Sequence, residues 1–321
     1  MTLANREAAA RILAATLTLL AREEESLPAP FALWRRPLKA GNIKDVAVKV
    51  AEGLASVVWV DDGYPARGLL IRQDQPLESV ILGYRSSRLL GPWLFEPDQA
   101  ERQRKTAALA QKALALSAGP EFMALKTSHD PAIIRGFNEA GFVVAEIGAE
   151  MAGPLLIDLI PEFPFTRREG LTLKSPGPRE GEKWLNQLGE LFYDGHYLHG
   201  PYLPRDFAAK LWRAVSLSHL SQSQPALFLW EEFGQRPVAV ALATTTGQEA
   251  RLLAIHVALD RRGQGLGRLL LLELTRMLAD QGVTTLVAET SSYNLPAIAL
   301  YQSLGLKAQS PVITLHGYKA K

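Results

Sequence analysis

One segment of the chain, residues 252–282, limits the possible folds more than any other. It begins with an apolar run from Leu252 to Leu259, which is too short for an ordinary helix and predicts a buried strand. A turn rich in charge and glycine follows from Asp260 to Gly267, and apolar residues then recur at helical spacing from Arg268 to Gln281. Gly282 is suited to end that helix. The segment therefore predicts a strand, a glycine turn and a helix in direct succession.

Such a succession can bind a phosphate group. The first amides of a helix have no partner within the helix and carry a partial positive charge, and an anion satisfies both. Glycines let the backbone approach the anion and adopt positive φ. Within eight residues the turn holds three glycines and three arginines: Gly263, Gly265, Gly267, Arg261, Arg262 and Arg268. We therefore predict an anion site here. The alternative is a solvated turn whose glycines serve only to bend the chain.

Two other phosphate-binding motifs fit this segment less well. A dinucleotide-binding fold would require glycines spaced G-x-G-x-x-G, whereas the turn reads G-x-G-x-G. Only 32 residues follow Glu289, which stands where a ribose-binding carboxylate would be, and a doubly wound sheet needs more chain. A P-loop fails because its lysine is missing.

Two patterns in this region resemble the GCN5-related N-acetyltransferase (GNAT) family. The stretch Arg262-Gly263-Gln264-Gly265-Leu266-Gly267 fits the family signature Q/R-x-x-G-x-G/A at a strand-to-helix turn. The pattern N-x-x-A-x-x-x-Y-x-x-x-G follows at Asn294, Ala297, Tyr301 and Gly305. The resemblance implies an enzyme that uses acetyl-CoA as co-substrate.

The resemblance also implies a role for particular residues. The turn would hold the pyrophosphate of CoA, the backbone of the preceding strand would pair with the pantetheine arm, and Tyr301 would lie near the thioester sulfur. Asn294 either caps the helix that opens at Pro296 or contacts the pantetheine. The residues implied in binding acetyl-CoA are Ile255, His256, Val257, Arg262, Gly263, Gln264, Gly265, Leu266, Gly267, Arg268 and Asn294.

Acetyl transfer to an amine requires a base for the amine and a proton for the leaving thiolate. The phenol of Tyr301 is the expected proton donor, and a packed aromatic without a catalytic role is the alternative. Glu146 and Glu289 are the carboxylate candidates for the base. His196 and His199 are the imidazole candidates, and a chain of water molecules leading to solvent would also serve.

A pattern that recurs at a spacing of about 164 residues predicts two copies of one fold. A Thr-Ser pair after a strand, a Pro-Ala-Ile helix start, an aromatic residue and a glycine recur in the same order in residues 127–142 and 290–306. The first copy lacks the arginine-glycine series at the corresponding place, residues 90–105, so we expect it to be degenerate. The expected fold class is α/β with a mixed sheet, in two tandem GNAT-like copies. Chance similarity is the alternative.

Proline-rich segments and patterning divide the chain further. We expect an N-terminal helix over residues 1–30, the degenerate copy over 31–163 and the catalytic copy over 164–321, with the boundary near Pro164. Other expected elements are strands at 55–60 and 68–72, an extended segment at 79–90, a helix at 97–118 and a hairpin of 225–230 with 237–244.

The layout of the two copies resembles one group more closely, the TDP-fucosamine N-acetyltransferases. The first copy ends in L-K-T-S…G-F-x-x-x-E, and the resemblance implies that Glu146 lies near the acceptor. That group usually carries S-R-F where this chain has Gly195-His196-Tyr197. We expect a small-molecule amine as acceptor, an amino sugar nucleotide first, with a peptide or protein amino terminus as runner-up. The residues expected to line the acceptor groove are Tyr197, His199 and Tyr202, with Glu146.

Composition excludes several other classes of protein. Hydrophobic residues make up 47% and charged residues 21%, which is typical of a globular protein, and a net charge of +2 without a long basic run argues against nucleic-acid binding. Without cysteine there is no disulfide, Cys-based zinc site or thiol nucleophile, and we expect no metal. A non-catalytic acyl-CoA-binding sensor remains as a rival hypothesis. The oligomeric state is open, with a homodimer as one option.

The apolar stretch near the N-terminus, residues 8–21, is interrupted by Arg11 and is too short to span a bilayer. We interpret it as an amphipathic helix and expect a cytoplasmic protein without a membrane partner.

Overall fold

The computed structural model describes most of the chain beyond residue 46. Three expectations from the sequence fall outside the described residues: the N-terminal helix, the domain boundary near Pro164, and the acceptor groove of Tyr197, His199 and Tyr202. Among the helices that are described, none is long and apolar enough to cross a membrane. The described ranges are 47–52, 54–60, 68–94, 96, 98–127, 130–155, 170–188, 203–204, 206–222 and 224–320.

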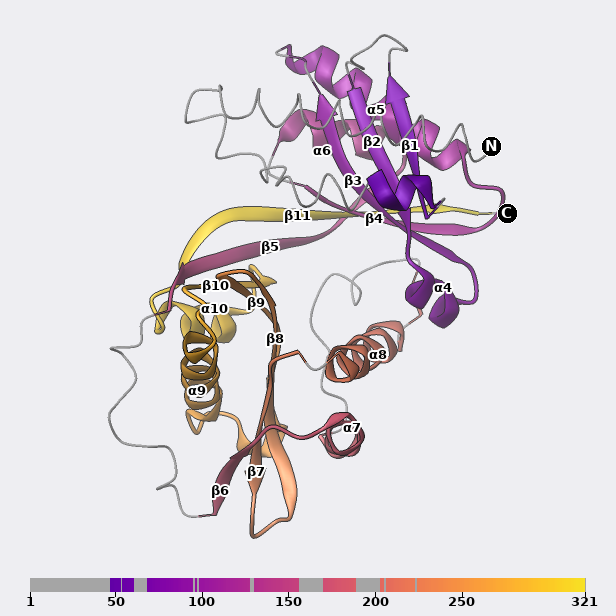
Figure 1. The fold of residues 1–321 in the computed structure, drawn as a ribbon. Helices are drawn as coiled ribbons and strands as arrows, with labels where there is room; N and C mark the ends of the chain where they lie inside the picture. Colours follow the sequence, from indigo (N-terminus) through magenta and orange to yellow (C-terminus); the bar gives the residue numbers. More distant parts are fainter. Residues whose placement is uncertain are drawn as a thin grey trace. The chain divides into compact units, whose positions relative to one another are not determined.

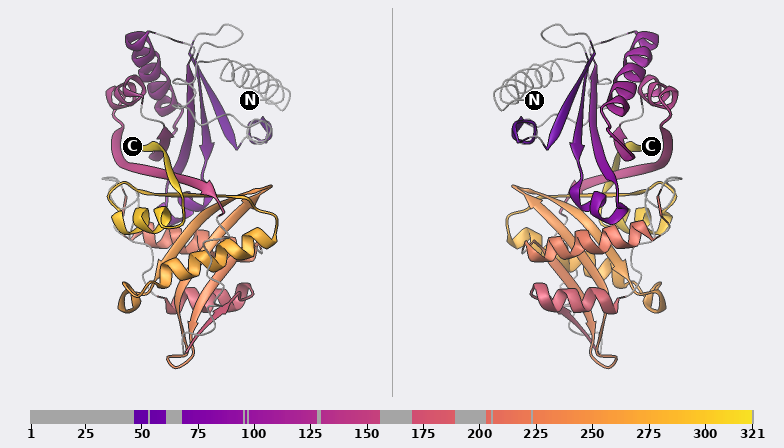
Figure 2. Two further views of the ribbon diagram at one scale, coloured as in Figure 1. Left: turned by 90° about the vertical axis from the view of Figure 1, so that its left-hand side faces the viewer. Right: turned by 90° about the vertical axis from the view of Figure 1, so that its right-hand side faces the viewer.

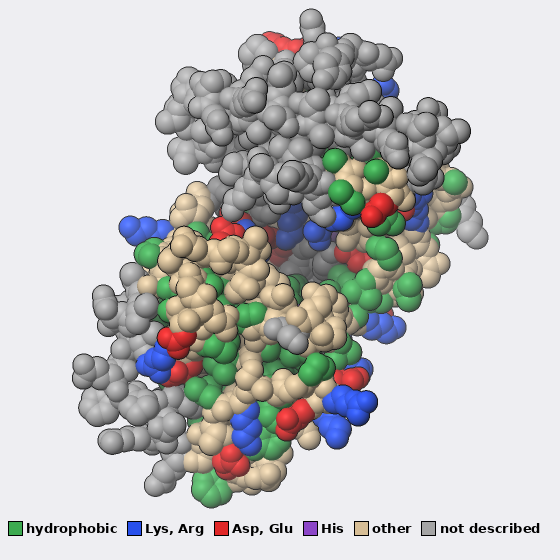
Figure 3. All heavy atoms as spheres, viewed as in Figure 1, with side chains coloured by type: hydrophobic (Ala, Val, Ile, Leu, Met, Phe, Trp, Pro, Cys, Tyr) green, Lys and Arg blue, Asp and Glu red, His purple; other side chains and the backbone are tan. Residues whose placement is uncertain are grey.

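Two compact units make up the chain. The first consists of Met1–Ile147, His199–Pro204 and Ser310–Lys321, and the second of Gly148–Leu198 and Arg205–Gln309. The limits expected for the domains from the sequence stay predictions. On the face shown in Figure 3, positive and negative side chains are interspersed.

The first unit is a mixed sheet with two helices packed on one face (Figures 1 and 2). In the sheet β1, β2 and β3 are antiparallel neighbours, β3 is parallel to β4, and the end of β11 is antiparallel to β4. Apolar residues of α5 and α6, among them Leu109 and Phe137, form a core with Leu70, Met123 and Leu315 of the strands. The elements are β1 (Ala55–Val60), β2 (Gly68–Asp74), α4 (Pro76–Leu82), β3 (Arg85–Leu94), α5 (Gln99–Ala115), β4 (Glu121–Thr127), α6 (Pro131–Glu139) and β11 (Lys307–Lys319).

One expected element of this unit was wrong. The extended segment expected over residues 79–90 begins as the short helix α4 and becomes a strand only at Arg85. Pro76 opens the helix, and Gly83, at φ 75°, ends it with its N–H bonded to the carbonyl of Ser79. These end signals are local and override an apolar pattern too short to distinguish a helix from a strand.

The second unit is a sheet in the order β5-β10-β9-β8-β7-β6 with helices on both faces (Figure 1). β9 and β10 are parallel, and the other neighbouring strands described in this unit are antiparallel. Alternate residues of β7 face opposite sides, so Leu229 packs in the core with α9 and Phe228 packs against Trp184 of α7. The elements are β5 (Val143–Pro154), β6 (Leu171–Lys174), α7 (Pro178–Gln187), α8 (Phe207–Ser221), β7 (Ala226–Glu231), β8 (Arg236–Thr246), β9 (Glu249–Val257), α9 (Leu266–Asp280), β10 (Thr285–Ser291) and α10 (Leu295–Gln302).

The internal repeat is visible as repeated structure. Each copy runs through a strand, a helix, a parallel strand, a short helix and a final strand, as β3-α5-β4-α6-β5 and as β9-α9-β10-α10-β11. Asp130 caps α6 by accepting from Ala132 N at 2.8 Å, and Asn294 caps α10 by accepting from Ala297 N at 3.3 Å. The mixed α/β fold expected from the sequence is thus confirmed.

The two copies exchange their final strands. Residues 148–154 of β5, which follows the first copy's α6, pair with β10 in the second unit. Residues 313–319 of β11, which follows the second copy's α10, pair with β4 in the first unit. Each unit therefore contains strands from both halves of the sequence.

Candidate active site

The turn between β9 and α9 has the expected order but a different boundary. β9 ends at Val257, a short 3-10 turn covers Leu259–Arg261, and α9 begins at Leu266 instead of Arg268. Gly265, at φ 74°, precedes the helix, and the side chain of Leu266 is buried as the first apolar anchor. Gly267 and Arg268 therefore belong to the first turn of the helix.

The three glycines of the turn serve two purposes. Gly263 and Gly265 both have φ of 74°, a region that side chains with a Cβ rarely adopt. Gly267 is different, because a Cβ added there would make only ordinary contacts, 3.6 Å from Val257 Cγ2 and 3.7 Å from Leu300 Cδ2. Neither the backbone nor the packing requires this glycine, so its bare surface at the helix start fits the close approach of a ligand.

The start of α9 is suited to an anion. No side chain caps it, and its first turn contains no acidic residue. Its first backbone hydrogen bond runs from Leu269 N to the carbonyl of Gly265, the residue before the helix, at 3.2 Å. The amides of residues 266–268 thus lack partners within the helix. In the first copy Asp98 caps α5 by accepting from Glu101 N at 2.8 Å, and Glu101 adds a second carboxylate. Carboxylates thus lie at that helix start and would repel an anion, which agrees with the expectation of a degenerate first copy.

The arginines of the turn differ in their environment. Arg262 is exposed and donates from Nε to the carbonyl of Val257 at 3.1 Å. Arg268 is exposed in the first helical turn and forms no ion pair with another described residue. Arg261, expected to add charge for the phosphate, is instead paired with Glu231. Two arginines of the three therefore remain for a phosphate.

The pairing between strands β9 and β10 ends before this turn, and the two strands separate there. Their parallel ladder covers four pairs and ends at Leu252↔Ala288. Beyond that pair β9 continues against β8 as far as Val257↔Ala239, and β10 continues against β5 as far as Ser291↔Gly148. The register between β8 and β9 shifts at the same place: Leu242 pairs with Ala254 and Ala243 with Leu252, so Leu253 of β9 is an extra residue. Such β-bulges are common next to functional sites. Ile255, His256 and Val257 are on this stretch of β9, whose edge away from β8 is outside the β10 ladder.

Tyr301 and Asn294 lie on the helix that follows β10. The Tyr301 side chain is 4% exposed in the core beneath α9, and burial raises the pKa of its phenol to about 12. Asn294 caps α10, and its Nδ2 donates to Thr290 Oγ1 at 3.1 Å. The capping role of Asn294 is therefore confirmed, while its contact with the pantetheine stays a prediction.

The base candidates belong to different parts of the molecule. Glu146 is a buried residue of β5 in the part assigned to the first unit, whereas the turn lies in the second. Glu289 is half-buried on β10, directly opposite Glu150 in the β5 ladder. His196 and His199 lie outside the described residues.

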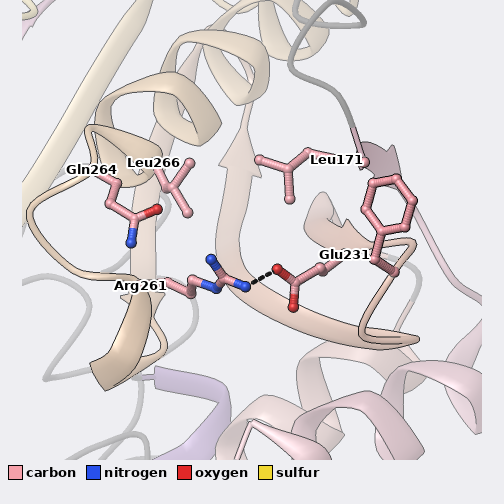
Figure 4. A pocket seen from close by; sticks show the side chains of 7 residues that line it. Leu171, Glu231, Arg261, Gln264 and Leu266 are labelled. Carbon is pink, nitrogen blue, oxygen red and sulfur yellow. Dashed lines mark hydrogen bonds and ion pairs between the residues drawn. The ribbon is translucent and has the colours of Figure 1, made fainter.

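A cavity of about 330 Å³ lies between the turn and the neighbouring strands β6 and β7. Figure 4 shows Arg261 reaching across it toward Glu231, with Gln264 and Leu266 on one side and Leu171 on the other. The sequence pattern did not indicate this cavity or the role of Glu231, because β7 and the turn are brought together only by the sheet. The lining residues are Gly170, Leu171, Glu231, Phe233, Arg261, Gln264 and Leu266.

Sequence comparison finds matches in the second half of the chain and in parts of curated proteins. Residues 185–306 match the model of the acetyltransferase (GNAT) family. A [ribosomal protein bS18]-alanine N-acetyltransferase of Salmonella typhimurium is 44% identical over 70 residues, which are 22% of this chain and 47% of that protein. N-acetyltransferase 8B of Homo sapiens is 38% identical over 71 residues, 22% of this chain and 31% of that protein. The chain thus spans less than half the length of these curated relatives.

Solved structures with the same fold extend over nearly the whole chain. A GCN5-related N-acetyltransferase from Sphaerobacter thermophilus has a TM-score of 0.62 at 16% identity and covers 99% of this chain and 94% of its own. A tandem GNAT protein from the clavulanic acid biosynthesis pathway has a TM-score of 0.59 at 14% identity, with 95% and 94% covered. At these identities the likeness shows the fold alone. The chain therefore has the fold of these proteins, and its residues 185–306 match the acetyltransferase (GNAT) family model.

Proposed function

We propose that this protein transfers an acetyl group from acetyl-CoA to a primary amine, with the donor bound by the second unit. The observation that carries the proposal is the start of α9, where an uncapped helix, two positive-φ glycines and Gly267 lie beside the point at which β9 and β10 part. An anionic group at this helix start and an extended arm along β9 suit a molecule that combines a diphosphate with pantetheine.

The residues proposed to hold the donor follow from that arrangement. The amides from Gly263 to Arg268 bind the diphosphate, with charge from Arg262 and Arg268. The backbone of Ile255, His256 and Val257 pairs with the pantetheine arm, because the β10 ladder no longer covers that edge of β9. When bound, acetyl-CoA supplies a thioester whose acyl carbon accepts the amine.

Tyr301 is proposed to stabilise the leaving sulfur. With a pKa of about 12 its phenol remains protonated at neutral pH and can donate a hydrogen bond. Complete proton transfer to a thiolate whose reference pKa is about 8.5 would be uphill by about 5 kcal/mol. Hydrogen-bond donation is therefore the role that its burial favours.

The proposals for the base and the acceptor come from the sequence. Glu146 is the base we propose, with Glu289, His196, His199 or a chain of water molecules as alternatives. Tyr197, His199 and Tyr202 are proposed to line the acceptor site, and an amino sugar nucleotide of the TDP-fucosamine type is the first candidate acceptor. A protein amino terminus is the second candidate, because the bacterial relative is named for an alanine of a ribosomal protein.

The test is a turnover assay on the purified full chain with acetyl-CoA and a panel of amines. The panel contains amino sugar nucleotides, simple amino sugars and peptides that begin with alanine, and both free thiol and the acetylated product are measured. We expect release of CoA that depends on one class of amine. Tight binding of CoA without turnover on any class would favour the sensor hypothesis, and absence of CoA binding would refute the donor site itself.

A further inference from the structure

Four charged residues tie the phosphate-binding turn to the neighbouring β7–β8 hairpin. Glu231, the last residue of β7, accepts from Arg236 Nε at 3.2 Å and from Arg261 on the turn. Arg236 also forms an ion pair with Asp260, which precedes Arg261. The hydrogen bonds to Asp260 and Glu231 raise the pKa of Arg236, and those from Arg236 lower the pKa of Asp260. Positive and negative groups thus alternate around a closed ring that includes the turn.

The hairpin is shaped to hold the central carboxylate in place. The side chain of Glu231 is 12% exposed, although both of its arginine partners are more than a third exposed. A Cβ added to Gly234, at the tip of the hairpin, would lie 2.5 Å from Glu231 Oε2. The missing side chain at Gly234 therefore leaves the room that the carboxylate occupies between the two arginines.

Apart from these ion pairs, the turn is held by local hydrogen bonds, such as Arg261 N to the carbonyl of Ala258 at 2.9 Å and Arg262 Nε to the carbonyl of Val257 at 3.1 Å. None of the three residues of the 3-10 turn Leu259–Arg261 is buried, and Leu259 is 76% exposed. The cavity lined by Arg261 and Gln264 removes apolar packing from beneath the turn (Figure 4). Three glycines add backbone freedom that ordering must overcome. The ion pairs of Asp260 and Arg261 are the side-chain contacts that join this part of the turn to the hairpin.

We propose that Glu231 is a positioning residue for the donor site. Through Arg261 and Arg236 it holds the turn in the shape that presents the amides of Gly263 to Arg268 to the diphosphate of CoA. Arg261 then acts as a tether of the turn, and its charge is neutralised by Glu231. A turn ordered in advance binds more tightly, because less conformational entropy is lost when the ligand arrives. This inference rests on the proposed function.

The test compares donors with and without a diphosphate in the full-length protein. In E231Q we expect the Kd of CoA and the KM of acetyl-CoA to rise together by roughly tenfold, with kcat changed less than twofold. With S-acetylpantetheine, which lacks the diphosphate, kcat/KM should change less than twofold. A merely structural loss would weaken both donors alike. E231D, which restores the charge, should recover part of the affinity.

Two further variants separate charge from position. Glu232→Gln is the matched control, because this adjacent glutamate pairs with Lys174 at 3.3 Å and Thr172 at 2.6 Å on β6 instead of with the turn. It should leave the Kd of CoA unchanged. G234A keeps every charge but displaces the Glu231 carboxylate, so it should raise the Kd as E231Q does, and it serves if E231Q does not fold.

The outcomes distinguish this inference from the proposed function. If the unmodified protein binds CoA and both E231Q and G234A leave its Kd unchanged, the positioning role is refuted and the donor site stands. An equal loss with S-acetylpantetheine, or a fall in kcat alone, also refutes it. If the unmodified protein does not bind CoA, the donor site and its positioning residue fail together.

Discussion

Leu252 of β9 and Ala288 of β10 form the last pair of the parallel ladder in the second unit. Each strand continues beyond this pair, but toward a different neighbour: β9 stays with β8, and β10 stays with β5. The edge of β9 after Leu252 is therefore where an extended ligand can take the place of a strand, and the turn proposed to bind phosphate follows within a few residues.

Gly267→Ala should weaken CoA binding without weakening the fold. The added Cβ meets only Val257 and Leu300 at ordinary contact distances, so we expect the melting temperature to stay within about 2 °C. The same atom would stand between the first helical turn and a diphosphate, and we expect the Kd of CoA to rise at least about tenfold. Titration calorimetry and thermal unfolding check both parts. Gly177→Ala, at the start of α7 with open space around it, is the control.

Tyr301→Phe should lower kcat by about tenfold or more while changing the Kd of acetyl-CoA little. The ring is buried in the core and phenylalanine keeps it, so only the hydroxyl is lost. Because burial raises the phenol pKa to about 12, kcat of the unmodified enzyme should show no loss from this group between pH 7 and about 10. Steady-state kinetics on both proteins test this. An unchanged kcat would remove Tyr301 from the mechanism.

His316 should make the first unit sensitive to acid. It is fully buried on β11 with its ring edge-on to Phe122, and burial lowers its pKa to about 4. In the unfolded chain this imidazole binds a proton near pH 6.5, whereas in the folded chain it stays neutral down to about pH 4. The free energy of unfolding is therefore highest above pH 6.5 and falls as the pH is lowered toward 4. The loss is about 3 kcal/mol. Urea unfolding at pH 7.5 and pH 5 should show a smaller difference for His316→Gln than for the unmodified protein; equal differences would contradict the prediction.

A fragment of residues 164–321 should not fold as an independent domain. It lacks residues 148–154 of β5, which pair with β10, and it lacks β4, which pairs with residues 313–319. Two strands would then expose unpaired edges, which favours aggregation. Circular dichroism and size-exclusion chromatography of the fragment and of the full chain are the measurements. A fragment that unfolds cooperatively at the temperature of the full chain would show that the exchanged strands are dispensable.

The sequence alone predicted the features that local patterns control. The spacing of apolar residues and the residues typical of helix ends located β9, α9 and α5 to within a few residues. These signals are local: Gly282, for example, adopts a φ of 81° directly after α9. The repeat was also visible in the sequence, because its helix starts depend on near neighbours. Asp130 and Asn294 each cap a helix by accepting from a backbone N–H two or three residues later. The arginine-glycine turn was visible for the same reason.

The tertiary structure decided what depends on residues far apart in the sequence. Because β5 and β11 are exchanged, Lys126 of β4 pairs with Thr314 of β11. Arg261 likewise forms an ion pair with Glu231, which lies thirty residues earlier in the chain. Neither pairing leaves a local pattern, because strand order and ion pairs between elements are fixed only when the sheets assemble. The sequence by itself thus determined where a turn rich in glycine and arginine precedes a helix, and the fold determined which distant side chains pair with that turn.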